Sequence, residues 1–176
     1  MKQKNELPLS EPGAYKDLLR RLLFEDELVR QLVMPSGGTP DSQTEEVWLT
    51  RHCLDVPYLD EQITDERSLL LIECLPLTSG EIRSYSITVT VCCHRNLINL
   101  SAEKRAGYHT QYGLTGNLAD MIVMAVNQAL SKDSTSRSFG IGKLRPASEK
   151  PVVSFIPNTQ FYGKTLTFEV FEMRRR

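Results

Sequence analysis

The sequence predicts a single α+β domain, in which an antiparallel sheet of four to five strands is packed by two main helices. Apolar side chains recur at helical spacing near the start of the chain and again after residue 116. The strand-like segments alternate apolar and polar residues. Their order of helix, strands, helix and strands differs from the alternating units of a parallel sheet. We expect residues 1–176 to form one domain, with flexible ends at 1–10 and 173–176.

The composition is that of a globular chain with its own core. Hydrophobic residues make up 40% of the 176 residues and charged residues 24%. A chain of this size buries about 70% of its extended surface on folding, so it needs no disulfide or structural metal. The four cysteines lack the spacing of secreted domains and predict free, buried thiols in a reducing cytoplasm. The polar start, Met1–Pro8, predicts no signal peptide, and no apolar run has the length of a membrane span.

The first helix is predicted over Ala14–Val33, where apolar residues recur every three to four positions. Ser10 can cap its start, and Pro12 is tolerated in a first turn. The apolar stripe changes phase at Phe24–Glu27, where Asp26 can cap a second short helix. A stretch rich in proline and glycine then ends the helical region.

The next segments favour strands. Val47–Thr50 is a short candidate, and an acidic loop around Pro57 follows it. Ser68–Leu75 is almost continuously apolar, which is typical of a strand covered on both faces. Glu81–His94 alternates apolar and polar residues and is the clearest strand. The residues Thr78–Gly80 between the last two segments indicate a hairpin connection.

The second half of the chain predicts one strong helix between polar stretches. Residues 95–116 are polar and contain three glycines, which predicts a long exposed loop. Leu118–Leu130 carries an apolar stripe at helical spacing, with Thr115 or Asn117 as its cap. A second polar stretch, 131–138, follows this helix. Three strands are expected near the end of the chain: Ile141–Arg145, Val152–Ile156 and Thr165–Phe171.

The cysteines and histidines do not have the spacing of a known catalytic or metal-binding motif. Cys92 and Cys93 are adjacent in a predicted strand, so their side chains point to opposite faces and cannot easily share one metal ion. Cysteine catalysis requires a thiolate beside a base, and no histidine lies in a recognisable motif. We expect His94 to end a strand at a sheet edge and His109 to lie in a solvated loop. No metal, cofactor or catalytic residue is predicted.

Charge is distributed unevenly along the chain. The net charge is −1, which argues against a general nucleic-acid binder. Residues 41–81 hold ten acidic and two basic side chains, for −8, whereas 82–176 hold thirteen basic and six acidic, for +7. This asymmetry indicates faces for different partners, or an acidic face of one copy that meets a basic face of the next; chance clustering on a solvated surface is the alternative. The candidate inter-subunit contacts are Asp60, Glu61, Asp65, Glu66, Lys143 and Arg145.

In its layout the chain resembles the tail-terminator, or tail-completion, proteins of the necks of tailed bacteriophages. The resemblance covers roughly residues 14–172. It begins with the amphipathic segment Tyr15–Val33. Five further segments carry it: HCLDVPYLDEQITDERSLLLIECLP, RSYSITVTVCCH, GNLADMIVMAVNQAL, FGIGKLRPAS and YGKTLTFEVFE.

This resemblance implies a structural function. Such proteins form a ring, usually a hexamer, on the head-proximal end of the tail tube, where the ring stops tube growth and docks to the head connector. The implied location is the virion, after assembly in the host cytoplasm, with DNA passing only through the lumen and no membrane partner. The polar stretches 95–116 and 131–138 would face the lumen or a partner ring and become ordered on assembly.

Other functions stay open on the sequence. A head–tail stopper or adaptor of the neck would share this layout, and a phage-tail-like bacteriocin could contain such a ring as well as an infectious phage. A small enzyme that uses Cys–His chemistry is the alternative from another class. An intracellular adaptor that docks one protein through its sheet edge is a further one.

Overall fold

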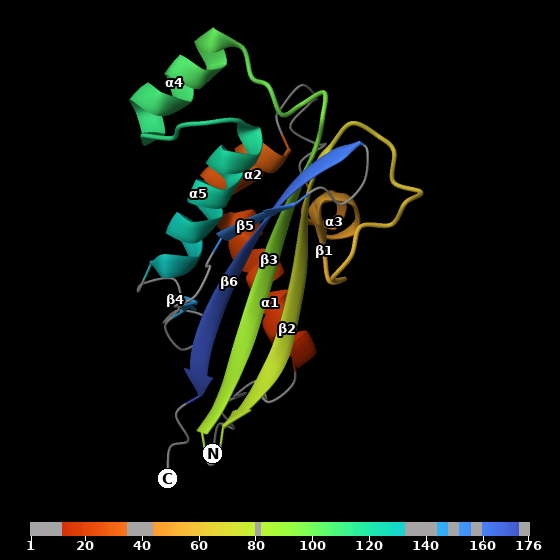
Figure 1. Cartoon of the computed structure of the whole chain (residues 1–176), viewed down its shortest axis with the longest axis vertical. Coiled ribbons are helices and arrows are strands. Elements are labelled where there is room, and N and C mark those ends of the chain that lie inside the picture. Colours follow the sequence, from red (N-terminus) through yellow and green to blue (C-terminus); the bar gives the residue numbers. More distant parts are fainter. Residues whose placement is uncertain are drawn as a thin grey trace.

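A six-stranded sheet organises the chain in the computed structural model, which describes residues 12–34, 44–79, 82–132, 144–147, 152–155 and 160–172. The strand order is β1-β2-β3-β6-β4, and β5 also pairs with β6. Three long strands form its centre, and three short ones lie at its two edges (Figure 1). The strands are β1 Cys53–Leu54, β2 Ser68–Ser79, β3 Ile82–His94, β4 Arg145–Pro146, β5 Val152–Phe155 and β6 Phe161–Glu172.

The central strands confirm the clearest sequence patterns. β2 pairs antiparallel with β3, and β3 pairs antiparallel with β6, so the three strands predicted at 68–75, 81–94 and 165–171 form the antiparallel centre of the sheet, with α4 and α5 between β3 and β6 in the chain. β1, in contrast, runs parallel to β2, with Cys53 opposite Leu70. A parallel pair needs a crossover instead of a tight turn, and residues 55–67 supply it. The sheet is therefore mixed, and the prediction of an antiparallel sheet of four to five strands was wrong.

Helices cover one face of this sheet. In Figure 1 α1 lies behind the long strands, α5 and α2 lie beside β6, and α4 stands at one end of the molecule. The expectation of two main helices was too low, because the described residues form five α-helices and one π-helical turn. They are α1 Pro12–Glu25, α2 Glu27–Val33, α3 Glu45–Val47, the π-helical turn Trp48–His52, α4 Ala102–Tyr112 and α5 Leu118–Ser131.

The predicted break in the first helical region is confirmed at Asp26. This residue is the N-cap of α2, and its Oδ1 atom accepts a hydrogen bond from the Val29 amide (3.1 Å). The cap lets the chain turn between α1 and α2 without leaving an amide of the new helix unpaired. The other predicted cap, Ser10, lies outside the described residues.

The main core lies between these helices and the sheet. Alternate residues of β3, from Tyr85 through Ile87 to Cys93, point toward the helices and are buried. Each fully buried aliphatic side chain of this kind stabilises the fold by about 1.5–3 kcal/mol relative to exposure. The helical partners in this core include Leu19, Leu23, Val29, Leu32, Ile122, Val126 and Ala129.

The strand predicted at Val47–Thr50 is wrong, because this segment is helical. Thr44 caps α3 by accepting a hydrogen bond from the Val47 amide (3.2 Å). The indole of Trp48 is fully buried and donates to the Arg20 carbonyl in α1 (2.9 Å). Arg20 in turn donates to the Cys53 carbonyl from Nε (2.7 Å). These contacts with α1 hold the segment in place, whereas a short apolar run by itself does not distinguish helix from strand.

The long loop predicted at 95–116 is also wrong, because half of it forms α4. Ser101 caps the helix by accepting from the Lys104 amide (3.3 Å), and Gly113 ends it in the left-handed conformation with φ +69°. None of the eleven residues of α4 is buried. The helix therefore has no apolar stripe in the sequence, and its end caps are the local signals that define it.

The helix predicted at 118–130 is confirmed as α5. Asn117 and Asp120 form a reciprocal capping box, so the cap at Asn117 is confirmed as well. Gly116 adopts φ +92°, and a Cβ atom added there would lie 2.7 Å from the Asp120 Cβ. Lys164 of β6 pairs with the same Asp120 carboxylate (2.5 Å) and ties the sheet to the start of the helix. Within the described ranges no helix is long and apolar enough to cross a membrane.

Candidate inter-subunit surfaces

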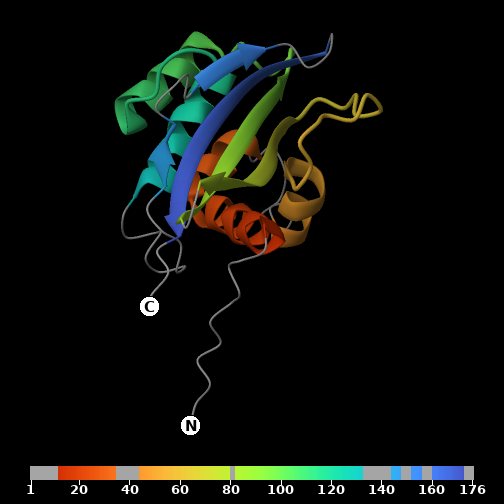
Figure 2. The same ribbon diagram turned by 60° about the horizontal axis from the view of Figure 1, so that its bottom comes forward.

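The acidic loop, defined as residues 55–67 between β1 and β2, is packed onto the sheet. Its apolar side chains cover one end of the sheet face that points away from the main core. They contact a small second core that contains Leu69 and Cys92. The loop lies at the β1 side of the sheet (Figure 2). The packed side chains are Leu54, Val56, Leu59 and Ile63 against Leu69, Leu71, Cys92 and Phe161.

Polar contacts fix the C-terminal part of the acidic loop. The Asp65 carboxylate lies 3.1 Å from Arg51 Nη2 and 3.1 Å from Arg67 Nε. The Glu66 carboxylate accepts a hydrogen bond from Asn96 Nδ2 (2.6 Å), just beyond β3. Two of the acidic candidates, Asp65 and Glu66, thus already have partners within their own subunit.

The other two acidic candidates lie on the exposed part of the loop. Asp60 and Glu61 are exposed, and Asp60 Oδ1 accepts from the Gln62 amide (2.9 Å) in a local turn. Among the described residues neither carboxylate has an ion-pair partner. Tyr58 projects beside them with 66% of its surface exposed. Tyr58 was not among the predicted contact residues; its signal in the sequence is a lone aromatic residue after Pro57 within a run of carboxylates.

The basic candidate Arg145 lies on the β4–β5 edge, defined as strands β4 and β5 along the outer side of β6. Arg145 is exposed and stands opposite Glu169 in the register of β4 and β6. Within the described part of the chain it has no ion pair. Val153 of β5 is 45% exposed on the same edge. Lys143, the other basic candidate, lies outside the described residues.

These candidates therefore lie on opposite edges of the sheet. The acidic loop follows β1, at one end of the strand order, whereas β4 and β5 pair with β6 at the other end. Figures 1 and 2 both place the loop and the β4–β5 edge on opposite sides of the long strands. The fold separates the acidic candidates from Arg145 instead of joining them in one site.

The outer edge of β2 beyond β1 is protected against strand addition. Lys16 of α1 reaches over this edge, where its Nζ atom lies 3.0 Å from Glu73 Oε1 and donates to the Asp55 carbonyl (3.2 Å). Pro76, further along β2, has no amide hydrogen to donate to an added strand. Charged side chains and proline are common protections of edge strands. A contact at this edge is thus expected to use side chains of the acidic loop.

The four cysteines are free and buried, as predicted. Cys92 points into the second core under the acidic loop and Cys93 into the main core, so their opposite orientations are also confirmed. Burial raises the pKa of both thiols to about 12. Both therefore stay protonated near neutral pH, which makes them poor nucleophiles. Among the described residues no group of three or more Asp, Glu, His or Cys side chains is placed to hold a metal ion.

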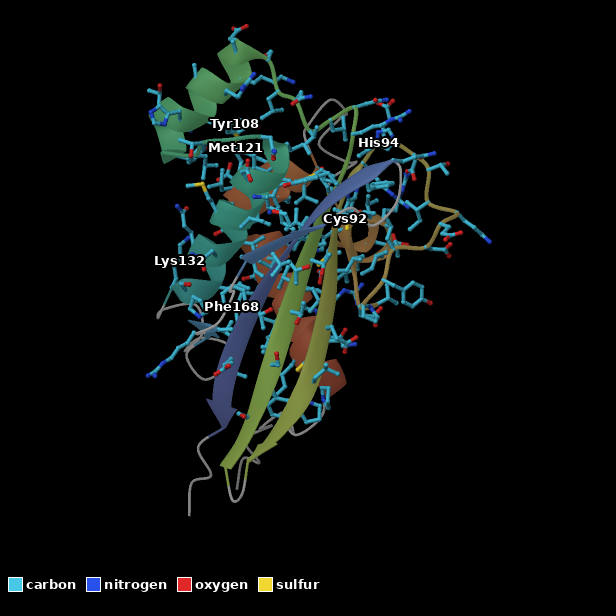
Figure 3. All side chains as sticks on the ribbon, viewed as in Figure 1. Cys92, His94, Tyr108, Met121, Lys132 and Phe168 are labelled. Carbon is cyan, nitrogen blue, oxygen red and sulfur yellow. The ribbon has the colours of Figure 1, made fainter. Side chains whose placement is uncertain are left out.

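The histidines are in structural positions. His94 ends β3, a central strand, so the prediction of a sheet edge was wrong; it lies near Cys92 in Figure 3 and is buried against Phe161. His52 donates from Nδ1 to the Ser68 carbonyl (2.9 Å). Burial lowers the pKa of His52, and this hydrogen bond only partly opposes the effect. His109 is exposed, as expected, but lies on α4 and not in a loop.

A cavity of about 430 Å³ lies between the start of α2, the end of α4 and the last turns of α5. The pair between Lys132 Nζ and Asp26 Oδ2 (3.1 Å) lies in its wall, with Lys132 near the end of α5 in Figure 3. Because Asp26 also caps α2, its carboxylate links the start of α2 to Lys132 at the end of α5. The cavity is lined by Glu25, Asp26, Glu27, Leu28, Tyr112, Ala125, Gln128 and Lys132.

Comparison with protein families gives one informative match. The model of the family described as YomW matches residues 16–170, from the first helix to the last strand. No curated protein matches the chain. The family name is that of a Bacillus phage-derived protein, which points to a phage-associated protein. Because the match covers nearly the whole chain, the protein belongs to the YomW family.

Proposed function

We propose that the protein is a structural component of a phage neck, which closes into a ring on the head-proximal end of the tail tube as a tail terminator does. The ring would stop growth of the tube, present a docking surface to the head connector and leave a lumen for DNA. The phage association of the YomW family supports the phage setting. The resemblance of the chain's layout to that of tail terminators supports the position in the neck.

One observation carries the proposal: the acidic loop and Arg145 lie on opposite edges of one sheet. A ring requires heterologous contacts, in which one surface of a copy meets a different surface of the next. Surfaces on opposite edges allow each copy to use both at once. Asp60 and Glu61 on one edge and Arg145 on the other are exposed and have opposite charge, so they favour this head-to-tail arrangement.

A stopper or adaptor of the neck is the second candidate, and α4 is the observation that favours it. This helix has no buried residue and stands at one end of the molecule (Figure 1). An exposed helix of this kind offers a surface to a protein stacked above or below a ring. The high pKa of the buried thiols weighs against the Cys–His enzyme alternative, because a thiol nucleophile works as the thiolate.

Charge reversal tests the ring. We expect the full-length protein to assemble into rings, measured by mass photometry and negative-stain electron microscopy. The variants D60K/E61K and R145E should each assemble poorly, because like charges then meet at every contact. An equimolar mixture of the two variants should assemble again. In that mixture the lysines of D60K/E61K meet the new glutamate of R145E. The unchanged acidic loop of R145E meets Arg145 of D60K/E61K, so every contact again joins opposite charges.

The matched control is K104E, which reverses one exposed basic residue on α4 and should leave ring formation unchanged. Assembly of both single-edge variants as efficiently as the unchanged chain would show that these edges do not form the contact. A chain that remains monomeric at every concentration would overturn the proposed ring of free subunits.

A further inference from the structure

We infer that Tyr58 is the apolar anchor of the contact between copies and packs against Val153 on the β4–β5 edge of the next copy. The inference rests on the proposed ring and names the residues at the centre of its repeated contact. The partner is a second copy of this chain. The argument combines exposure, the faces on which the residues lie, spacing and charge.

The exposure of Tyr58 is unusual for its surroundings. Its neighbours Val56 and Leu59 are packed onto the sheet, and the Asp65 ion pairs fix the end of the loop. Tyr58 remains 66% exposed on this ordered segment. A tyrosine held outward by a fixed loop loses little conformational entropy on binding and brings a large amphipathic surface. Tyrosine is among the residue types that dominate the energetics of protein contacts.

Val153 provides the complementary surface on the opposite edge. It stands opposite Thr165 in the register of β5 and β6, and opposite residues in a strand pair share one face. Thr165 faces away from the helices, because its neighbour Leu166 belongs to the main core. Val153 and the acidic loop thus lie on the same outer side of the sheet, at opposite edges. With Tyr58 and Leu75, Val153 is one of the large hydrophobic side chains that the described residues expose.

The charges flank this apolar pair at matching distances. Arg145 and Val153 stand opposite Glu169 and Thr165 of β6, which are about 13 Å apart at the rise of a strand. Tyr58 and Glu61 are three residues apart, which corresponds to at most about 10 Å of chain. The reach of the arginine side chain covers the difference. With Tyr58 on Val153, Asp60 or Glu61 lies within reach of Arg145 when the acidic loop of one copy runs toward β4 of the next, which gives a charged rim beside an apolar centre.

Disulfide trapping tests the contact directly. Y58C and V153C are made as separate full-length chains, purified, mixed in equal amounts and oxidised. We expect covalent dimers in the mixture and little cross-linking of either variant alone, because the contact joins two different surfaces. The natural cysteines are buried, so they should not contribute to the cross-link. Y58A should weaken association about 30-fold, which is the effect of removing an interface anchor.

The control is L75S, which replaces an exposed apolar residue of β2 outside the inferred contact and should not change association. Rings that form without the cross-link and are unaffected by Y58A would overturn the inference while leaving the ring. Cross-linked dimers without any ring would support the contact and overturn the proposed ring. Cross-linking of Y58C with itself would indicate a two-fold contact and overturn the inference.

Discussion

Cys92 and Cys93 form adjacent positions of β3 and are enclosed by different cores. We predict that neither reacts with a thiol reagent in the folded chain near neutral pH, and that both react once the chain is unfolded. The physical reason is burial, which blocks access and raises the pKa of both thiols to about 12. A time course of absorbance with a disulfide reagent, with and without denaturant, measures this difference.

The same burial makes the free energy of unfolding depend on pH at high pH. The folded pKa is higher than the unfolded value of about 9, so the contribution of each thiol to stability is complete below pH 9 and decreases as the pH rises toward 12. A rapid reaction of either thiol in the folded chain would contradict the prediction. It would also favour the Cys–His enzyme alternative, since fast reaction near neutral pH requires a thiolate.

Single residues were predictable where their chemistry acts locally. Asp26, and Thr115 or Asn117, were expected as caps because a short polar side chain before an apolar helical stripe bonds to nearby amides; Asp26 and Asn117 are confirmed. Tyr58 was not predictable as an exposed residue. Its exposure depends on Val56 and Leu59, which bind the loop to strands that follow it in the chain.

At the scale of elements, α4 packs least against the core among the helices with more than ten residues, α1, α4 and α5. We predict that its amides exchange with deuterium much faster than those of α5, measured by mass spectrometry on the free protein. Isolated helices shorter than about 12–15 residues are marginal in water. α4 has eleven residues and no buried side chain, and its main apolar contacts are the partly buried Tyr108 and Tyr112. Figure 3 labels Tyr108 beside Met121 of α5.

α5 is the internal control for this experiment, because nine of its residues are buried in the main core. Equal protection of α4 and α5 in the free protein would contradict the prediction. Protection of α4 that increases only in the assembled protein would place it in a contact, as expected for a helix that docks a neighbouring ring.

Two elements were predicted wrongly for identifiable reasons. Val47–Thr50 has the residue types of a short strand, but the burial of Trp48 against Arg20 and the cap at Thr44 favour a helix. Residues 95–116 lack an apolar stripe because α4 packs so little against the core. Periodic patterns report burial, so they cannot detect a helix that is mostly exposed.

At the scale of the whole molecule, assembly should depend on salt. We predict that raising sodium chloride from about 50 mM to about 500 mM weakens association by up to about tenfold per contact, because exposed ion pairs contribute roughly 0.2–1 kcal/mol each and are screened. Analytical ultracentrifugation at several salt concentrations measures this. Association that strengthens with salt would indicate a contact dominated by apolar surface.

The relative placement of the two edges could not be predicted from the sequence. The net charges of −8 for residues 41–81 and +7 for residues 82–176 follow from the sequence, but they do not show which side chains face outward. All five side chains are exposed, but Asp65 and Glu66 have partners within the subunit, whereas Asp60, Glu61 and Arg145 have no ion pair among the described residues. Sheet order and the contacts of Arg51 with Asp65 and of Asn96 with Glu66 join residues far apart in the chain, and local patterns carry no information about them.

The sequence by itself determined the elements whose signals are local: the long strands β2, β3 and β6, the helices α1, α2 and α5, the caps of α2 and α5, and the burial of the thiols. Periodic burial leaves a repeating pattern in the chain, which is why these elements were predictable. Only the tertiary structure decided that β1 runs parallel to β2, that the acidic loop is packed on the sheet, and that Tyr58 and Arg145 lie on opposite edges. Those features depend on contacts between distant segments, whose free energy exists only once the chain has folded.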